Sequence, residues 1–292
     1  MEPTLLQILL LALVQGAAEL LPVSSSAHVI VAEKLIGLDP ASPSMTFLLA
    51  MLHTGTMVAV IAYFWKAWKR TFFASAETLK QSLLHVGAAT LATLVFGGAL
   101  ILVIEKGFMR GTPHNEIEDL FGHLPLVGGA LLTAGLLILA TGLLCKKDGT
   151  RSLNLASSLW IGLSQGLCLP FRGLSRSGTT ISTGVLLGIT RQRVEEFSFA
   201  LAVVITPPVI AKELLRVLKS HAGAGIATQP LSHLQLLHLL GPGLFGMVAA
   251  FIAGILALRL LSSWLEKGHW AWFGYYCIGF SGFVFYLATR GY

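Results

Sequence analysis

The chain has 292 residues, of which 54% are hydrophobic and only 12% are charged, whereas charged residues make up about 25% of a typical water-soluble domain. Together with a mean hydropathy of +0.76, these values exclude a soluble globular fold, a disordered chain and a small disulfide-rich secreted module. The twenty Lys and Arg residues behind the net charge of +6 lie mainly in short connections between apolar segments, as in helical membrane proteins. We therefore expect contact with membrane lipids and no nucleic-acid partner.

The chain begins with an interrupted apolar segment, residues 4–35. A first apolar half is followed by Glu19, Pro22 and a run of three serines before apolar residues resume. Each half is too short to cross about 30 Å of hydrocarbon, whereas two half-helices suit a hairpin with a polar tip. Because irregular backbone inside a membrane needs cover from protein or water, the segment predicts a re-entrant hairpin.

Uninterrupted apolar stretches of about 20 residues predict membrane-spanning helices. Five of them contain no formal charge, and they cover residues 45–64, 84–104, 124–144, 236–258 and 268–289. A sixth candidate, residues 197–218, contains Pro207 and Pro208, which remove backbone donors and predict a bend. The pattern indicates an all-α integral membrane protein with about six transmembrane helices.

A second interrupted segment, residues 152–190, has the same form as the first, with apolar halves around a tip rich in serine and glycine. Short motifs recur between the two: Gln15-Gly16 as Gln165-Gly166, and the serines at 24–26 as Ser175-Arg176-Ser177. We therefore predict a single membrane domain of two repeats, 1–148 and 149–292, each opening with a re-entrant hairpin.

Charge predicts how the repeats are oriented. By the positive-inside rule, the basic connections after the first and third uncharged spans are expected in the cytoplasm. The mixed acidic and basic loop 105–123 is expected outside, so the first hairpin enters from outside and the second from the cytoplasm, as an inverted repeat. The cytoplasmic basic residues are Lys66, Lys69, Arg70, Lys80, Lys146, Lys147 and Arg151.

The two tips carry Glu19 and Arg176 within membrane segments. An ionisable group there costs about 2.5–3.5 kcal/mol even on lenient insertion scales, so both are functional candidates, with a purely structural ion pair as the alternative. Hydroxyls, glycines and the N-termini of the second half-helices surround them, and this combination favours an anion, above all phosphate. The predicted phosphate-binding hydroxyls belong to Ser24, Ser26, Ser175, Ser177 and Thr180.

His28 follows the serine cluster by one helical turn, so its imidazole is expected to meet a serine hydroxyl. An imidazole transfers protons at neutral pH, and a serine needs a base to act as a nucleophile. We therefore interpret Ser25 and His28 as catalytic, against a structural hydrogen-bonding role for His28. His53, in an otherwise uncharged span, either lines the same cavity or bonds another helix. Gln15 and Arg172 are further cavity-lining candidates.

The motifs around these residues resemble the signatures of bacterial undecaprenyl-diphosphate phosphatases, the bacitracin-resistance family. They are QGAAELLPVSSSAH at 15–28 and GLSRSGTT at 173–180, with further matches at 53–60 and 196–203. The resemblance implies an inverted-repeat membrane enzyme that removes one phosphate from undecaprenyl diphosphate and so recycles the lipid carrier of cell-wall synthesis. It also implies a site facing the periplasmic side of the bacterial inner membrane. The implied active-site residues are Glu19, Ser25, His28, Ser175, Arg176, Ser177 and Thr180.

The chain departs from this family pattern at two positions. The first signature usually has two acidic residues four apart, and the first of these is Gln15 here; the second usually places proline directly before its glycine, whereas Pro170 precedes Gly173 by three. Glu19 is therefore the one tentative metal ligand. We expect Mg²⁺ or Ca²⁺ to be held mainly by the substrate diphosphate, and no organic cofactor.

Phosphoryl transfer depends on positioning and electrostatic stabilisation, which we assign to Arg176, the hairpin amides and the hydroxyls. Ser25 is the preferred nucleophile, with His28 or Glu19 accepting its proton. Two other routes are direct attack by His28 and attack by water that Glu19 activates. The alternative function is a membrane transporter or flippase for a phosphorylated lipid or anion, because inverted repeats with broken helices are a common transporter design.

Overall fold

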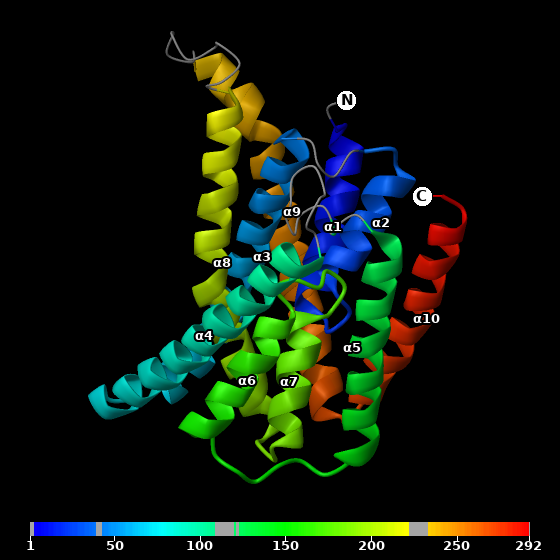
Figure 1. Ribbon diagram of the computed structural model, residues 1–292. Coiled ribbons are helices and arrows are strands. Elements are labelled where there is room, and N and C mark those ends of the chain that lie inside the picture. The colour runs from blue at the N-terminus through cyan, green and yellow to red at the C-terminus, as the bar shows by residue number, and fades with distance from the viewer. Residues whose placement is uncertain (1–2, 39–42, 109–119, 121–122, 222–232, 292) are drawn as a thin grey trace.

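The computed structural model describes residues 3–38, 43–108, 120, 123–221 and 233–291. In these ranges the chain is a helical bundle without a β-sheet (Figure 1), so the predicted all-α class is confirmed. The helices are α1 (Leu5–Leu20), α2 (Ser25–Leu35), α3 (Pro43–Thr71), α4 (Ala76–Val103) with the π-helical turn η1 (Ile104–Phe108), α5 (Leu124–Leu144), α6 (Leu155–Leu167), α7 (Arg176–Leu186), α8 (Arg191–His221), α9 (His233–Glu266) and α10 (Trp270–Thr289).

Five helices in the described residues are long and apolar enough to cross a membrane: α3, α4, α5, α9 and α10. They contain the five uncharged stretches predicted from the sequence, except for residue 104, which belongs to η1, and residues 268–269, which precede α10. Helix α4 exposes apolar side chains such as Leu91 and Val95, as a lipid-facing helix does. The sixth predicted span lies in α8, which continues through Pro207 and Pro208. Most of the predicted outer loop, 105–123, lies outside the described residues.

Two pairs of short helices, α1 with α2 and α6 with α7, occupy the segments predicted as re-entrant hairpins. Helix α1 ends at Leu20 because Pro22 disfavours helical backbone at the residue before it. Ser24, at φ +69°, then caps α2, and Ser175 caps α7 in the same way. Their membrane re-entry and the inverted repeat stay predictions.

The first helix of each pair packs closely against a long helix from the other half of the chain. A Cβ on Gly16 of α1 would lie 2.6 Å from the Cβ of Ala253 on α9. For the second pair, a Cβ on Gly97 of α4 would lie 2.8 Å from the carbonyl oxygen of Gly166 on α6. Small residues allow this close approach, which stabilises helix contacts inside a membrane. The recurring Gln-Gly motif therefore marks two tight helix crossings.

Buried side chains connect the two tips to the rest of the bundle. Leu20 and Val23 at the first tip belong to the same cluster of buried residues as Ile138 on α5 and Ile181 on α7. Such close packing holds each side chain in one arrangement. The tips are therefore fixed parts of the bundle and can carry a defined site.

Candidate active site

Polar contacts join the two hairpin tips across the halves of the chain. The backbone N–H of Gly173 donates to Ser26 Oγ at 3.3 Å, and Ser177 Oγ donates to the carbonyl oxygen of Leu21 at 3.3 Å. Gly173 has φ +108°, and any Cβ there would collide with the backbone of Val127. This position therefore requires glycine, and two of the predicted phosphate-binding hydroxyls hold the tips together.

Glu19 lies at the centre of the junction and is bonded on both carboxylate oxygens. Its Oε1 accepts from Arg176 Nη2 at 2.6 Å, and its Oε2 accepts from Ser25 Oγ at 2.5 Å and from Gln15 Nε2 at 3.3 Å. His53 Nε2 lies 3.7 Å from Glu19 Oε2. The side chains of Glu19 and Arg176 are 15% and 19% exposed, so the pair is largely buried and still reachable by a ligand.

The positions of Glu19 and Arg176 oppose the preferences of their own helices. Glu19 is in the last turn of α1, at the negative end of the helix dipole, and Arg176 begins α7, at a positive end. Each charge is therefore unfavourable for its own helix and is stabilised by the other. Residues that break a local rule in this way are expected at functional sites.

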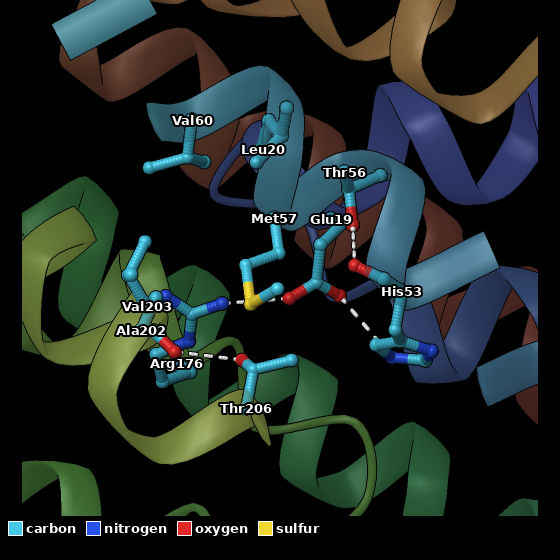
Figure 2. A pocket seen from close by; sticks show the side chains of 10 residues that line it. All are labelled: Glu19, Leu20, His53, Thr56, Met57, Val60, Arg176, Ala202, Val203 and Thr206. Atoms are coloured by element: carbon cyan, nitrogen blue, oxygen red, sulfur yellow. Dashed lines mark hydrogen bonds and ion pairs between the residues drawn. The ribbon is translucent and has the colours of Figure 1, made fainter. Parts of the chain in front are cut away.

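A small pocket of about 10 Å³ opens on this ion pair, and Figure 2 shows Glu19 between Arg176 and His53 at its polar side. The rest of the lining is mostly apolar and includes Met57 of α3 and Val203 of α8. Arg176 Nη1 is buried and has no hydrogen-bond partner among the described residues. A buried donor without a partner is unfavourable, so an anionic oxygen bound here would satisfy it.

His28 is turned away from this pocket. Its Nδ1 lies 2.8 Å from the carbonyl oxygen of Ser24 and its Nε2 lies 2.7 Å from Tyr276 Oη, while its ring stacks on Phe280 at 4.0 Å between centroids. A carbonyl only accepts, so Nδ1 carries the proton and Nε2 accepts from the tyrosine. The expected contact between His28 and a serine hydroxyl is not found in the described contacts. The imidazole that lines the pocket is that of His53.

The remaining predicted hydroxyls support the local fold. Ser24 Oγ and Ser175 Oγ each accept from a backbone N–H three residues further on, and so cap α2 and α7. Thr180 is buried and its Oγ1 lies 2.6 Å from Ser198 Oγ on α8. None of these residues lines the pocket, and neither does Arg172. Gln15 and Ser25 are also outside the lining, but both donate hydrogen bonds to Glu19, which lines it.

Three residues near the site were not among the sequence candidates. Thr56 and Thr206 line the pocket, and Tyr276 holds His28. The histidine–threonine motif that begins at His53 contains Thr56 and could have identified it. Tyr276 gives no such signal, because it is one of many aromatic residues in α10.

The donor set does not fit a divalent cation held by the protein alone. Mg²⁺ and Ca²⁺ take six or more oxygen ligands, and no group of three or more His, Cys, Asp or Glu suitable for a metal occurs in the described residues. Both oxygens of Glu19 already accept hydrogen bonds, from Arg176 and Ser25. Beside them, Gln15 Oε1 is a buried oxygen without a hydrogen-bond partner in the described part of the chain.

Comparison with known proteins gives a match along nearly the whole chain. Residues 8–283 match the family model of the bacitracin resistance protein BacA, a range that includes both hairpin tips and all residues that line the pocket. The chain is 54% identical to undecaprenyl-diphosphatase 2 of Acinetobacter baylyi, with 97% of this chain and 98% of that protein covered. It is 30% identical to the undecaprenyl-diphosphatase of Desulfosudis oleivorans, with coverage of 99% and 100%. The undecaprenyl-diphosphatase of Parabacteroides distasonis is also 30% identical, with 92% of each chain covered.

Proposed function

Because the chain belongs to the bacitracin resistance protein BacA family, we propose that it is an enzyme that dephosphorylates undecaprenyl diphosphate to undecaprenyl phosphate. The observation that carries this proposal is the arrangement at Glu19, where Ser25 Oγ lies 2.5 Å from one carboxylate oxygen and Arg176 Nη2 lies 2.6 Å from the other. A hydroxyl, a base and a fixed cation are the groups that phosphoryl transfer requires.

Arg176 binds the terminal phosphate. Its Nη2 is oriented by Glu19, and its unpartnered Nη1 donates to a phosphate oxygen. The planar guanidinium is well suited to such contacts, and in a site of low dielectric it stabilises the charge that spreads over the phosphoryl oxygens. The prenyl chain lies against apolar helix surfaces, which begin at the pocket wall with Met57 and Val203.

Ser25 is the proposed nucleophile. Its Oγ attacks the terminal phosphorus while Glu19 Oε2 takes the hydroxyl proton, and the bond from phosphorus to the bridging oxygen breaks as prenyl phosphate leaves. Glu19 passes the proton to the leaving phosphate and then deprotonates a water, which attacks the phosphoserine. Inorganic phosphate is released and Ser25 is regenerated, with the proton from water returned to its Oγ.

His53 supports the carboxylate in this cycle. Its Nδ1 lies 2.8 Å from the carbonyl oxygen of Leu49, which fixes the proton on Nδ1 in the neutral ring. The unprotonated Nε2 then faces Glu19 Oε2 at 3.7 Å. From there it can accept a hydrogen bond from protonated Glu19 and so stabilise the proton that Glu19 holds before passing it to the leaving phosphate or back to Ser25.

No step is assigned to a resident metal ion, because the protein supplies too few ligands. We propose that Mg²⁺ or Ca²⁺ arrives on the diphosphate of the substrate, since hard cations favour phosphate oxygens. When bound, such a cation withdraws negative charge from the diphosphate. Glu19 and the free oxygen of Gln15 are the nearest protein ligands for it.

We further propose that this multi-pass membrane protein lies in the inner membrane with its active site toward the periplasm. The basic connections, including Lys147 and Arg151, support a cytoplasmic position for the opposite end of the bundle. In a cysteine-free background, Lys147→Cys should react with an impermeant maleimide only after cells are opened. Labelling in intact cells would reverse the orientation.

Phosphate release in detergent tests the function directly. Purified protein should release inorganic phosphate from undecaprenyl diphosphate without a sealed membrane, whereas a transporter or flippase would not. Arg176→Ala should abolish most of this release while the purified variant keeps its helical spectrum. Near-full release by this variant would reject the site assignment.

A further inference from the structure

A second cavity lies at the far end of α7 from the Glu19 pocket. Arg176 begins α7 and Leu186 ends it, and a helix of these 11 residues is about 16 Å long. Thr190, just beyond this end, belongs to the lining of a polar cleft of about 450 Å³. The end of α3, the start of α4, the segment before α6 and the start of α8 form its walls, and no residue lines both cavities.

The cleft has a positive charge that its own described lining does not neutralise. Glu196, the one carboxylate in that lining, is paired with Arg193 at 3.2 Å and also accepts from Thr71 Oγ1 at 3.2 Å. Arg151 has no ion pair in the described residues, and its side chain donates only to the carbonyl oxygen of Leu187 at 3.3 Å. The guanidinium of Arg151 is therefore oriented at one end and has four further N–H donors for an anion.

Helix α4 presents polar and apolar groups side by side at this cleft. Thr78, Ser82 and His85 are spaced four and three residues apart, so they share one face of the helix, and all three line the cleft. The neighbouring Leu83 and Leu84 are exposed on a helix that is long and apolar enough to span a membrane. In Figure 1 the first half of α4 projects away from α6 and α8, so a ligand in the cleft can contact lipid as well.

The cleft lies at the basic end of the bundle. Lys69 and Arg70 end α3, and Lys146 and Lys147 follow α5. Basic pockets between membrane helices bind anionic lipid headgroups, and about 450 Å³ falls within the usual range of small-ligand sites. We propose that this cleft binds the phosphate of an anionic phospholipid headgroup, with Arg151 as its main contact.

In this complex, hydroxyls of the lining, such as that of Ser82, donate to the remaining phosphate oxygens. The acyl chains lie along the exposed Leu83 and Leu84 of α4. The positive charge of Arg151 therefore binds the phosphate, and the apolar surface of α4 binds the acyl chains. This site is separate from the Glu19 pocket and does not depend on the reaction proposed there.

Native mass spectrometry of the full chain in a neutral detergent tests the proposal. Titration with phosphatidylglycerol should give saturable binding that phosphatidylcholine of the same chain length does not match. Arg151→Gln should weaken phosphatidylglycerol binding about tenfold or more, as expected for a lost charged hydrogen bond. Lys147→Gln removes the same charge outside the cleft and should change the affinity by less than about twofold.

Ser82→Leu provides a second variant, because it fills the cleft without changing any charge and should also weaken binding. Each variant should keep the lipid-free melting temperature and the phosphate release of the parent. Equal binding of phosphatidylglycerol and phosphatidylcholine would overturn the proposal. So would an equal loss of phosphatidylglycerol affinity in Arg151→Gln and Lys147→Gln. So would displacement of the lipid by inorganic phosphate at an equal concentration, because a site for phosphate alone would then explain the binding.

Discussion

Arg176 Nη2 lies 2.6 Å from Glu19 Oε1, although 157 positions separate the two residues in the chain. In the proposed mechanism this contact makes the active site depend on both hairpins, because one supplies the base and the nucleophile while the other supplies the cation. A buried ion pair is not by itself a strong source of stability. The unpartnered Nη1 of Arg176 and the adjacent pocket favour a role in binding an anion.

Replacement of Arg176 is expected to affect the reaction and also to lower stability, because the Glu19 carboxylate is left largely buried without its cation. Arg176→Ala should lower kcat/KM for undecaprenyl diphosphate by about 10²–10³-fold, the usual effect of removing one group that stabilises developing charge. Arg176→Lys keeps the positive charge and loses the planar guanidinium with its paired N–H donors. Its kcat/KM should therefore lie between that of Arg176→Ala and that of the parent. Phosphate release measured over a range of substrate concentrations provides these values.

Arg172 offers the matched control on the same tip, because it does not line the pocket. Arg172→Ala should keep kcat/KM within about twofold. An equal loss in Arg172→Ala and Arg176→Ala would mean that the general positive charge of the tip matters, and would contradict a specific contact by Arg176.

Substitutions of the neighbouring Ser25 and Ser26 should distinguish a catalytic role from a structural one. Ser25→Ala should lower kcat by at least about 10³-fold, because it removes the nucleophile. Ser26→Ala loses the hydrogen bond from Gly173 N–H and should cost about 1 kcal/mol of stability with little change in kcat. Acid quenching with substrate labelled in its terminal phosphate should trap phosphoserine at Ser25 in the parent protein and in Ser26→Ala. Full activity of Ser25→Ala would instead favour attack by water.

Some of the site could be predicted because a charge inside an apolar segment needs a physical reason. Glu19 and Arg176 are such charges, and the motif around Glu19 also contains Ser25, whose Oγ donates to Glu19. The helices followed from apolar stretches of sufficient length, and the breaks in the two hairpins followed from proline and serine. These signals are local, so a single sequence contains them.

The imidazole could not be assigned from local spacing. His28 is one helical turn from the serines, yet its ring bonds the carbonyl oxygen of Ser24 within its own helix and Tyr276, which is 248 positions away. His53 reaches Glu19 only because α3 packs beside α1. Which side chain faces the pocket depends on how distant helices cross, and helical spacing within one segment does not determine that.

The two histidines are therefore expected to behave differently. His53→Ala should lower kcat/KM by about 10²-fold, the lower range for loss of proton-transfer catalysis. His28→Ala should keep kcat/KM within about twofold of the parent value and lower the melting temperature, because it breaks the contact with Tyr276.

Tyr276→Phe should lower the melting temperature in the same way. In the double variant His28→Ala/Tyr276→Phe, the change in the free energy of unfolding should differ from the sum of the two single changes by about 0.5 kcal/mol or more, as for residues in contact. If His28→Ala lowered kcat/KM about 10²-fold while His53→Ala left it unchanged, the assignment of the pocket imidazole would be wrong.

We expect Gln15 to determine how the site responds to cations in the absence of substrate. In Gln15→Glu a second carboxylate would lie beside Glu19, with which Gln15 Nε2 is now in contact at 3.3 Å. Two buried carboxylates repel each other, and a divalent cation relieves that repulsion while accepting oxygen ligands. Gln15→Glu should therefore bind Ca²⁺ in the absence of substrate, measured by isothermal titration calorimetry, and the parent protein should bind it at least about tenfold more weakly.

Gln165→Glu is the control, because it adds a buried acid at the equivalent place in the second hairpin, beside Thr93. If the parent protein or Gln165→Glu bound Ca²⁺ as tightly as Gln15→Glu does, residue 15 would not determine the Ca²⁺ affinity. Residues other than Gln15 and Glu19 would then hold the cation.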